Sequence, residues 1–123
     1  MESDLHKLRE KIRQFDAERD WAKFHNYKDL LIALMSEVGE LAECYRWLDA
    51  EELERIHSDP AKKKQVESEI ADIFMFLERI ARKSDIDLFE AVERKIENIR
   101  KRYPIENIKG KHTNKLEGFK VKE

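Results

Sequence analysis

Cysteine, glycine and proline are all scarce in this chain of 123 residues, and each scarcity excludes a class of protein. The single cysteine, Cys44, excludes an internal disulfide and any zinc cluster built from cysteines. Three glycines and two prolines are too few for turn-rich β-sandwiches and barrels, and for a glycine-rich phosphate loop. These absences favour a helical protein whose chemistry does not depend on thiols.

The chain has neither a large excess of one charge nor a long hydrophobic run. The chain has 25 Lys and Arg against 27 Asp and Glu, so no overall basic field would hold a nucleic acid polymer. No apolar run approaches the roughly 20 residues of a membrane span, and the first residues lack a signal-peptide pattern. With 41% hydrophobic residues, the sequence can still build one core. We expect a soluble, cytoplasmic, mostly helical protein with one domain, residues 1–123.

Apolar residues recur at intervals of three and four along most of the chain, which predicts helices. A first helix is expected from Ser3 or Asp4, with its apolar stripe reaching Phe15. The remaining segments are a helix over about 28–47, a short connecting turn over 49–57, a helix opened by Ser58-Asp59-Pro60 and reaching Lys83, and a helix opened by Ser84 or Asp85 and stopped by Pro104.

Four to five helices with short connections predict an all-α antiparallel bundle. The second and third long helices are apolar over more than a narrow stripe, so we expect oligomerisation, as a homodimer or homotetramer, to complete the bundle. The lysine-rich tail from about residue 104 is expected to be irregular.

Two pairs of acids stand out, Glu37 with Glu40 and Glu69 with Asp72. Pairs with this spacing are common in so acidic a sequence, and the ordinary interpretation is a solvated helix face with salt bridges. These four, however, have no Lys or Arg three or four residues away. Glu37 and Glu69 lie at the edge of their helices' apolar stripes, and Glu40 and Asp72 lie about 60° further round. Antiparallel packing would bring the four carboxylates to one rim of the core.

Four like charges at a partly buried rim repel one another and resist desolvation, so either some are protonated or a cation neutralises them. Ligands that are all oxygen favour Mg²⁺, with Mn²⁺ as an alternative. Gly39, inside the first pair, costs about 1 kcal/mol of helix propensity relative to alanine. A close approach of backbone or ligand at Gly39 would explain this glycine.

Three segments together resemble a known family. They are Arg19-Asp-Trp-Ala-Lys-Phe-His25, Glu37-Val-Gly-Glu40 with Trp47, and Glu69-Ile-Ala-Asp72. They resemble the MazG-like nucleotide pyrophosphohydrolases, in particular the dCTP pyrophosphatase-like branch of the all-α NTP pyrophosphatase superfamily. The similarity runs from about Arg19 to Gly110.

This resemblance implies an activity. The family hydrolyses nucleoside triphosphates to the monophosphate and pyrophosphate with Mg²⁺, and the implied role is nucleotide-pool housekeeping. Glu37, Glu40, Glu69 and Asp72 would be the metal ligands and the catalytic residues. Because no Ser, Cys or His lies in a nucleophile–base arrangement, a metal-activated water would attack.

The resemblance also implies a set of substrate-binding residues. Trp21, His25, Trp47 and Phe76 would hold the nucleoside, and Lys95, Arg102 and Lys109, with Lys111, would hold phosphates. Alternatively, Trp21 only packs the first helix on the second, His25 is structural, and Lys111 is an ordinary surface lysine. Phe76 and Ile99 replace a tyrosine and an asparagine that are frequent in the family, so the preferred base stays unassigned.

Other functions compete with this one. Phosphoribosyl-ATP pyrophosphohydrolases and all-α dUTPases share the acidic motifs, but the Arg19–His25 segment argues against both. A ferritin-like di-iron protein needs two Glu-x-x-His pairs, and only Glu54 with His57 fits. A non-catalytic helical interaction module, with an inert quartet, is the remaining alternative, and such a module should ignore Mg²⁺.

Overall fold

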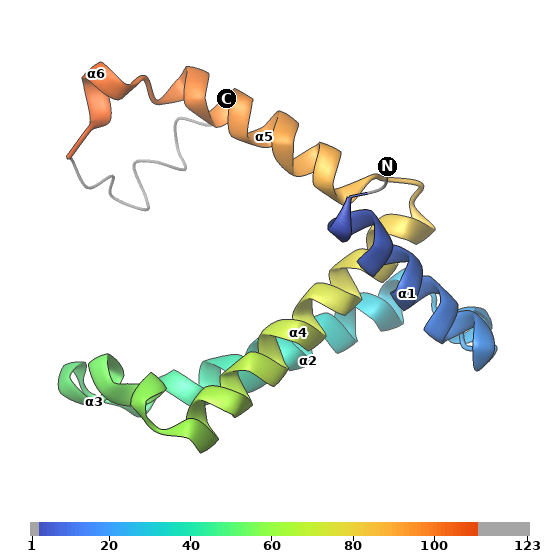
Figure 1. Ribbon diagram of the computed structural model, residues 1–123, viewed down its shortest axis with the longest axis horizontal. Helices are drawn as coiled ribbons and strands as arrows, with labels where there is room; N and C mark the ends of the chain where they lie inside the picture. The colour runs from blue at the N-terminus through green and yellow to red at the C-terminus, as the bar shows by residue number, and fades with distance from the viewer. Residues whose placement is uncertain (1–2, 111–123) are drawn as a thin grey trace. The chain divides into compact units, whose positions relative to one another are not determined.

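The computed structural model describes residues 3–110, and every regular element among them is helical (Figure 1). This confirms the all-α class. The chain divides into two compact units after Leu88. The elements are α1 (Asp4–Glu18), a 3-10 helix (Ala22–Phe24), α2 (Tyr27–Tyr45), α3 (Ala50–Arg55), a second 3-10 helix (Ile56–Ser58), α4 (Pro60–Lys83), α5 (Leu88–Arg102) and α6 (Ile105–Ile108).

The starts of α1 and α4 follow directly from their capping residues. The Ser3 side chain accepts a hydrogen bond from the His6 amide at the start of α1. The Asp59 carboxylate accepts from the Ala61 amide, at 3.0 Å, and Pro60 occupies the first turn of α4, where its missing N–H costs nothing. Both starts confirm the sequence-based predictions.

The predicted start of the last long helix is wrong. Ser84 does not open α5; its hydroxyl donates to the Ile80 carbonyl at 2.8 Å and so closes α4. Asp85 has a φ of +55°, and the Ile86 amide donates back to the Ala81 carbonyl. Helix α4 therefore ends in a Schellman motif, in which the residue just past the end of the helix is left-handed and is usually glycine. An aspartate tolerates that conformation, so the sequence offered no glycine to mark the end of α4.

α1 ends in the same way, and its ending places a predicted site residue. Asp20 has a φ of +51°, and the Trp21 amide donates to the Asp16 carbonyl at 3.0 Å. The Trp21 ring packs edge-on against Phe15, with 5.6 Å between ring centroids. A hydrophobic contact of this kind commonly accompanies the Schellman motif. Trp21 is therefore held where α1 stops.

Helices α2 and α4 lie side by side and antiparallel (Figure 1). Tyr27 at the start of α2 donates its hydroxyl hydrogen bond to the Lys83 carbonyl at the end of α4, at 2.9 Å. The middle of each helix therefore faces the middle of the other, which is where both acidic pairs lie.

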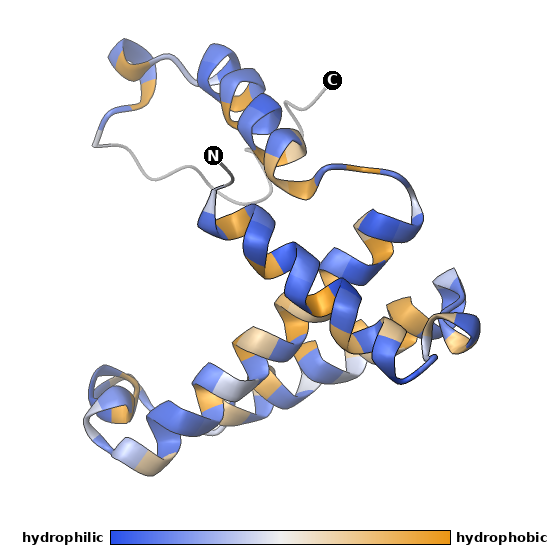
Figure 2. Cartoon of the chain, turned by 45° about the vertical axis from the view of Figure 1, so that its right-hand side comes forward, coloured by the Kyte–Doolittle hydropathy of each residue, from blue (hydrophilic) through white to orange (hydrophobic). Residues whose placement is uncertain are grey.

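The first unit has a small apolar core, composed of Ile12, Leu30, Ile56, Val66 and Ala81. Three polar side chains are buried with it: Asp16, Glu78 and Arg79. Many large apolar side chains on α2 and α4 are exposed instead, including Leu31, Ile32, Met35, Val38, Ile70 and Leu77, and Figure 2 shows hydrophobic residues recurring along these helices. The core of this unit leaves much apolar surface in contact with water.

The second unit contains α5 and α6. α5 ends at Arg102, just before Tyr103 and Pro104, as the proline predicts. One turn of helix, α6, follows Pro104, where the sequence suggested an irregular tail. Within residues 3–110, we find no helix with both the length and the apolar character needed to cross a membrane. The predictions for residues 111–123 lie outside the part of the chain that the structure describes.

Candidate metal and active site

Three of the four singled-out acids meet between α2 and α4. Glu37, Glu40 and Glu69 each offer a carboxylate oxygen, and these oxygens lie within 4.8 Å of one another. Glu37 and Glu40 are one turn apart on α2, and Glu69 comes from the facing helix. The convergence across the two helices agrees with the sequence analysis, whereas the catalytic role of these residues stays a prediction.

Asp72 lies beside this group rather than in it. It follows Glu69 by one turn on α4 and is half-buried. Its oxygens are not part of the 4.8 Å group, but its negative charge helps to raise the pKa of both Glu37 and Glu69. Asp72 is therefore close enough to act on the other three carboxylates electrostatically.

The acids perturb one another strongly. A hydrogen bond with Glu69, followed by burial and by the neighbouring Glu40 and Asp72, raises the pKa of Glu37 to about 7. The hydrogen bond with Glu37 favours the charged form of Glu69, but burial and the charge of Glu40 and Asp72 leave the pKa of Glu69 raised as well. In the absence of a cation, both carboxyls therefore hold a proton more tightly than an isolated glutamate does.

The unpartnered oxygens of this cluster suit a hard cation. Oε2 of Glu37 and Oε2 of Glu69 are both buried without a hydrogen-bond partner. Within the described residues, no Lys or Arg forms an ion pair with any of the four acids. Buried polar atoms are normally satisfied, and carboxylate oxygens without a base are the ligands that Mg²⁺ and Mn²⁺ prefer.

Gly39 does not make the close approach that we expected. A Cβ atom added there would meet no described heavy atom within 4 Å. Nothing among the described residues therefore requires a glycine between Glu37 and Glu40.

Two of the four predicted nucleoside-binding residues contact the same buried ion pair. His25, after the first 3-10 helix, has Nδ1 3.9 Å from an Asp16 carboxylate oxygen. Phe76, one turn after Asp72 on α4, has the Arg79 guanidinium carbon 5.2 Å from its ring centroid. Arg79 also binds Asp16, so Asp16 and Arg79 connect these two predicted positions.

Trp47 is not brought near Trp21. Trp21 precedes α2 and Trp47 follows it, and a helix of 19 residues is about 28 Å long. Trp47 is 73% exposed; its indole N–H donates to Glu43 at 3.2 Å, and the Arg46 guanidinium lies 4.5 Å from its ring centroid. Within one chain, the two tryptophans cannot hold the same base.

The predicted phosphate-binding residues belong to the second unit. Lys95 and Arg102 lie on α5, and Lys109 follows α6. Lys95 and Lys109 are exposed and Arg102 is half-buried. Lys111 lies outside the described residues. The roles of all four stay predictions.

Sequence reasoning missed a buried charge cluster composed of Asp16, Arg79 and Arg82. Asp16 is 1% exposed and accepts hydrogen bonds from both arginines. One signal was available: Asp16 continues the apolar stripe of α1 one turn after Ile12, where an acid needs a partner. Its partners, 63 and 66 residues away, could not be found from local spacing.

Comparison with known proteins agrees with this arrangement. The model of the MazG-like family matches residues 32–116, a segment that contains all four acids. The chain belongs to the MazG-like family. Both motifs that carried the resemblance in sequence, Glu37-Val-Gly-Glu40 and Glu69-Ile-Ala-Asp72, lie within the matched segment of this MazG-like chain.

Individual relatives of the MazG-like chain include two vertebrate enzymes. It is 38% identical to dCTP pyrophosphatase 1 of Bos taurus over 109 residues, and 36% identical to that of Mus musculus, in each case over 89% of this chain and 64% of the relative. The chain thus spans less than two thirds of these relatives' length. A pyrophosphatase structure from Archaeoglobus fulgidus is similar with a TM-score of 0.76 and 31% identity, covering 85% of this chain and 95% of that one.

Proposed function

We propose that this MazG-like protein is a divalent-metal-dependent nucleoside triphosphate pyrophosphohydrolase, which releases a nucleoside monophosphate and pyrophosphate. The observation that carries the proposal is the group of carboxylates with unpartnered buried oxygens at Glu37 and Glu69. The names of its relatives, dCTP pyrophosphatase 1 and a pyrophosphatase, support the same reaction class. Mg²⁺ is the proposed ion and Mn²⁺ a substitute.

The four acids have distinct parts in this proposal. Glu37, Glu40 and Glu69 would hold the metal through the oxygens that lie within 4.8 Å of one another. When bound, Mg²⁺ neutralises phosphate charge and acidifies a coordinated water. Asp72, half-buried beside them, would orient that water or accept its proton. A negatively charged triphosphate could not approach this acidic group without cations.

Substrate recognition is proposed to use residues outside the acidic group. Trp21, His25 and Phe76 would contact the nucleoside, since an aromatic face stacks on any base for about 1–3 kcal/mol. Lys95, Arg102 and Lys109 would neutralise the leaving pyrophosphate. The exposed apolar residues of α2 and α4 support a homo-oligomer, because a monomer rarely leaves so much apolar surface in water. Trp47 would then serve a site that one chain alone does not build.

The test is pyrophosphate release from a panel of ribo- and deoxyribonucleoside triphosphates with Mg²⁺. We expect Glu40→Gln and Asp72→Asn each to lower kcat/KM by more than about a hundredfold, because losing even an outer partner of a metal ligand costs about 10–100-fold. Circular dichroism should show an unchanged fold. Glu67→Gln is the matched control, since Glu67 is exposed on the same helix as Asp72 and outside the cluster.

The alternatives make different predictions. If Glu40→Gln and Asp72→Asn both keep wild-type activity, the assignment of this acidic group as the metal and active site is wrong. An interaction module would release no pyrophosphate from any nucleotide and would gain no stability from Mg²⁺. A phosphoribosyl-ATP pyrophosphohydrolase would prefer phosphoribosyl-ATP to every member of the panel.

A further inference from the structure

One carboxylate oxygen, Oδ2 of Asp16, is contacted by three residues, two of which are more than sixty positions away in sequence. It lies 2.9 Å from Nε of Arg79, 2.9 Å from Nη2 of Arg82 and 3.9 Å from Nδ1 of His25. Oδ1 accepts a further bond from Arg79 at 3.0 Å, so the Arg79 pair is bidentate. At 1% exposure, Asp16 is fixed by these contacts.

The main chain of Asp16 holds the segment that follows α1. Its carbonyl accepts hydrogen bonds from the Trp21 amide at 3.0 Å and the Arg19 amide at 3.2 Å. The side chain anchors α1 to α4, and the carbonyl anchors the turn that carries Trp21. A displacement of Asp16 would therefore move Trp21 relative to α4.

Arg79 extends this connection to Phe76. Its guanidinium carbon is 5.2 Å from the Phe76 ring centroid while two of its nitrogens bind Asp16. Phe76 follows Asp72 by one turn on the same face of α4. The cluster thus connects the segment of Trp21 and His25 with an aromatic ring next to the acidic group.

We propose that Asp16 and Arg79 form a positioning pair that sets base selectivity: Asp16 fixes Trp21 and His25, and Arg79 fixes Phe76, so that the three hold a nucleobase in one geometry. This inference rests on the proposed function, because it takes these three residues to contact the nucleoside. Neither Asp16 nor Arg79 is a ligand of the metal or a catalytic residue here. Their effect is on where the base lies.

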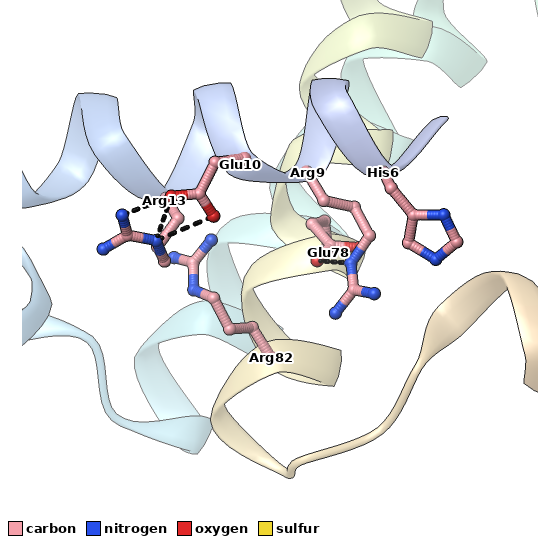
Figure 3. Close-up of a pocket in the computed structure, with 6 residues that line it drawn as sticks. All are labelled: His6, Arg9, Glu10, Arg13, Glu78 and Arg82. Carbon is pink, nitrogen blue, oxygen red and sulfur yellow. Dashed lines mark hydrogen bonds and ion pairs between the residues drawn. The ribbon is translucent and has the colours of Figure 1, made fainter. Parts of the chain in front are cut away.

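The same two helices provide a matched control. Arg9 on α1 donates from Nε to Glu78 on α4 at 2.8 Å, and Glu78 is fully buried (Figure 3). This ion pair also joins α1 to α4, but Arg9 lies about two turns before Asp16 on α1, toward the opposite end of the helix from the segment that carries Trp21 and His25. Glu78→Gln therefore removes a buried interhelical charge of the same kind without touching the proposed positioning pair.

The experiment compares Asp16→Asn with Glu78→Gln in the full chain with Mg²⁺. We expect Asp16→Asn to raise KM for the best nucleotide about tenfold, to narrow the spread of kcat/KM across the panel, and to change kcat by less than about threefold. Glu78→Gln should lower thermal stability but leave KM and selectivity as in the wild type. Arg79→Lys keeps the charge without the bidentate geometry. Its KM and its selectivity should lie between those of the wild type and of Asp16→Asn.

A second readout does not depend on activity. The chain has two tryptophans, so a ¹⁵N-labelled sample gives two indole N–H signals, one from Trp21 and one from Trp47. Asp16→Asn and Arg79→Lys should shift the Trp21 signal and leave that of Trp47 in place, while Glu78→Gln should shift neither. If Asp16→Asn does not fold, Arg79→Lys decides the question with the same two readouts.

The outcomes separate the two proposals. If the wild type hydrolyses no nucleotide, the proposed function fails, and the Trp21 signal alone then decides whether Asp16 positions this segment. If Asp16→Asn and Glu78→Gln change KM and the Trp21 signal equally, the cluster only stabilises the fold and the positioning role is overturned. The same holds if Arg79→Lys leaves both unchanged.

Discussion

Helix α4 carries two charged regions that differ in the sign of their partners. In its middle, Glu69 and Asp72 face Glu37 and other acids, with no base among their described partners. Toward its end, Arg79 and Arg82 meet a single acid, Asp16. The first region has acids without a base and needs a cation from outside, whereas the acid of the second region is already paired with two bases of the chain. The contrast identifies which cluster is available for a ligand.

The direction of the pKa shift differs between the two regions because their charged partners differ in sign, and at Asp16 the partners together outweigh burial. Burial alone would raise the pKa of Asp16, but hydrogen bonds and charge from Arg79 and then Arg82 bring it below its usual value. Glu37 is more exposed than Asp16, yet its acidic neighbours raise its pKa to about 7. Neighbouring bases lower the pKa of a carboxyl and keep it charged even when it is buried. Neighbouring acids raise the pKa of a carboxyl even when it is partly exposed.

The largest effect that would sharpen this comparison is on stability. We expect Asp16→Asn to lower the free energy of unfolding by about 3–5 kcal/mol, because it leaves the buried Arg79 without its counter-charge. Glu37→Gln, in the absence of divalent metal, should not lower stability and should raise it by relieving repulsion. Urea unfolding of both variants in EDTA measures the difference. Equal losses in the two variants would show that the clusters do not differ in this way.

Metal linkage tests the acidic region alone. At free Mg²⁺ one hundred times its Kd, binding to the folded state adds about 2.7 kcal/mol of stability. We expect this gain in the wild type and in Asp16→Asn, and its loss in Glu40→Gln. Differential scanning calorimetry over a Mg²⁺ titration, with Ca²⁺ and Mn²⁺ in parallel, measures it. A wild type whose unfolding temperature ignores every divalent ion would contradict the metal site.

The pH dependence of the metal-free protein has a definite sign. The pKa of Glu37 is raised to about 7 in the folded chain from its ordinary value of 4.5, so its contribution to stability is fully present below pH 4.5 and is lost as pH rises through about 7. His25 has a lowered pKa, chiefly through burial, and contributes in the opposite sense as pH rises toward 6.5. Subtracting the stability–pH curve of Glu37→Gln from that of the wild type removes the contribution of His25. The difference should fall between pH 4.5 and 8, and Mg²⁺ should abolish that fall.

Much of the fold could be predicted because the relevant signals are local. Asp59 and Pro60 mark the start of α4 through groups within three residues of them, and the heptad-like spacing of apolar residues marks each helix. The start of α5 could not, because Ser84 closes α4 through its side chain and Asp85 takes the left-handed conformation usually left to glycine. The four-residue helix α6 after Pro104 is too short to give any periodic signal.

The candidate site also has one part that local sequence spacing predicts and one part that it does not. The acidic group was predictable because missing bases can be read from positions three and four residues away, and the helix period places Glu37 and Glu69 at facing edges. The Asp16 cluster was not, since its bonds to Arg79 and Arg82 span more than sixty positions and depend on how α1 crosses α4. The separation of Trp21 from Trp47 follows from the length of α2, which the sequence did contain.

The smallest expected effect concerns Gly39, between two of the acids. Because an added Cβ would meet no described heavy atom within 4 Å, Gly39→Ala should raise the free energy of unfolding by about 0.5–1 kcal/mol through helix propensity alone. Chemical denaturation in EDTA measures this gain, with Mg²⁺ affinity as the second readout. A loss of stability that grows with protein concentration would mean that a second subunit lies against α2 at Gly39. Unchanged stability with weakened Mg²⁺ binding would instead place the metal or its water shell against this turn, and would move the centre of the acidic site from Glu69 toward Glu40.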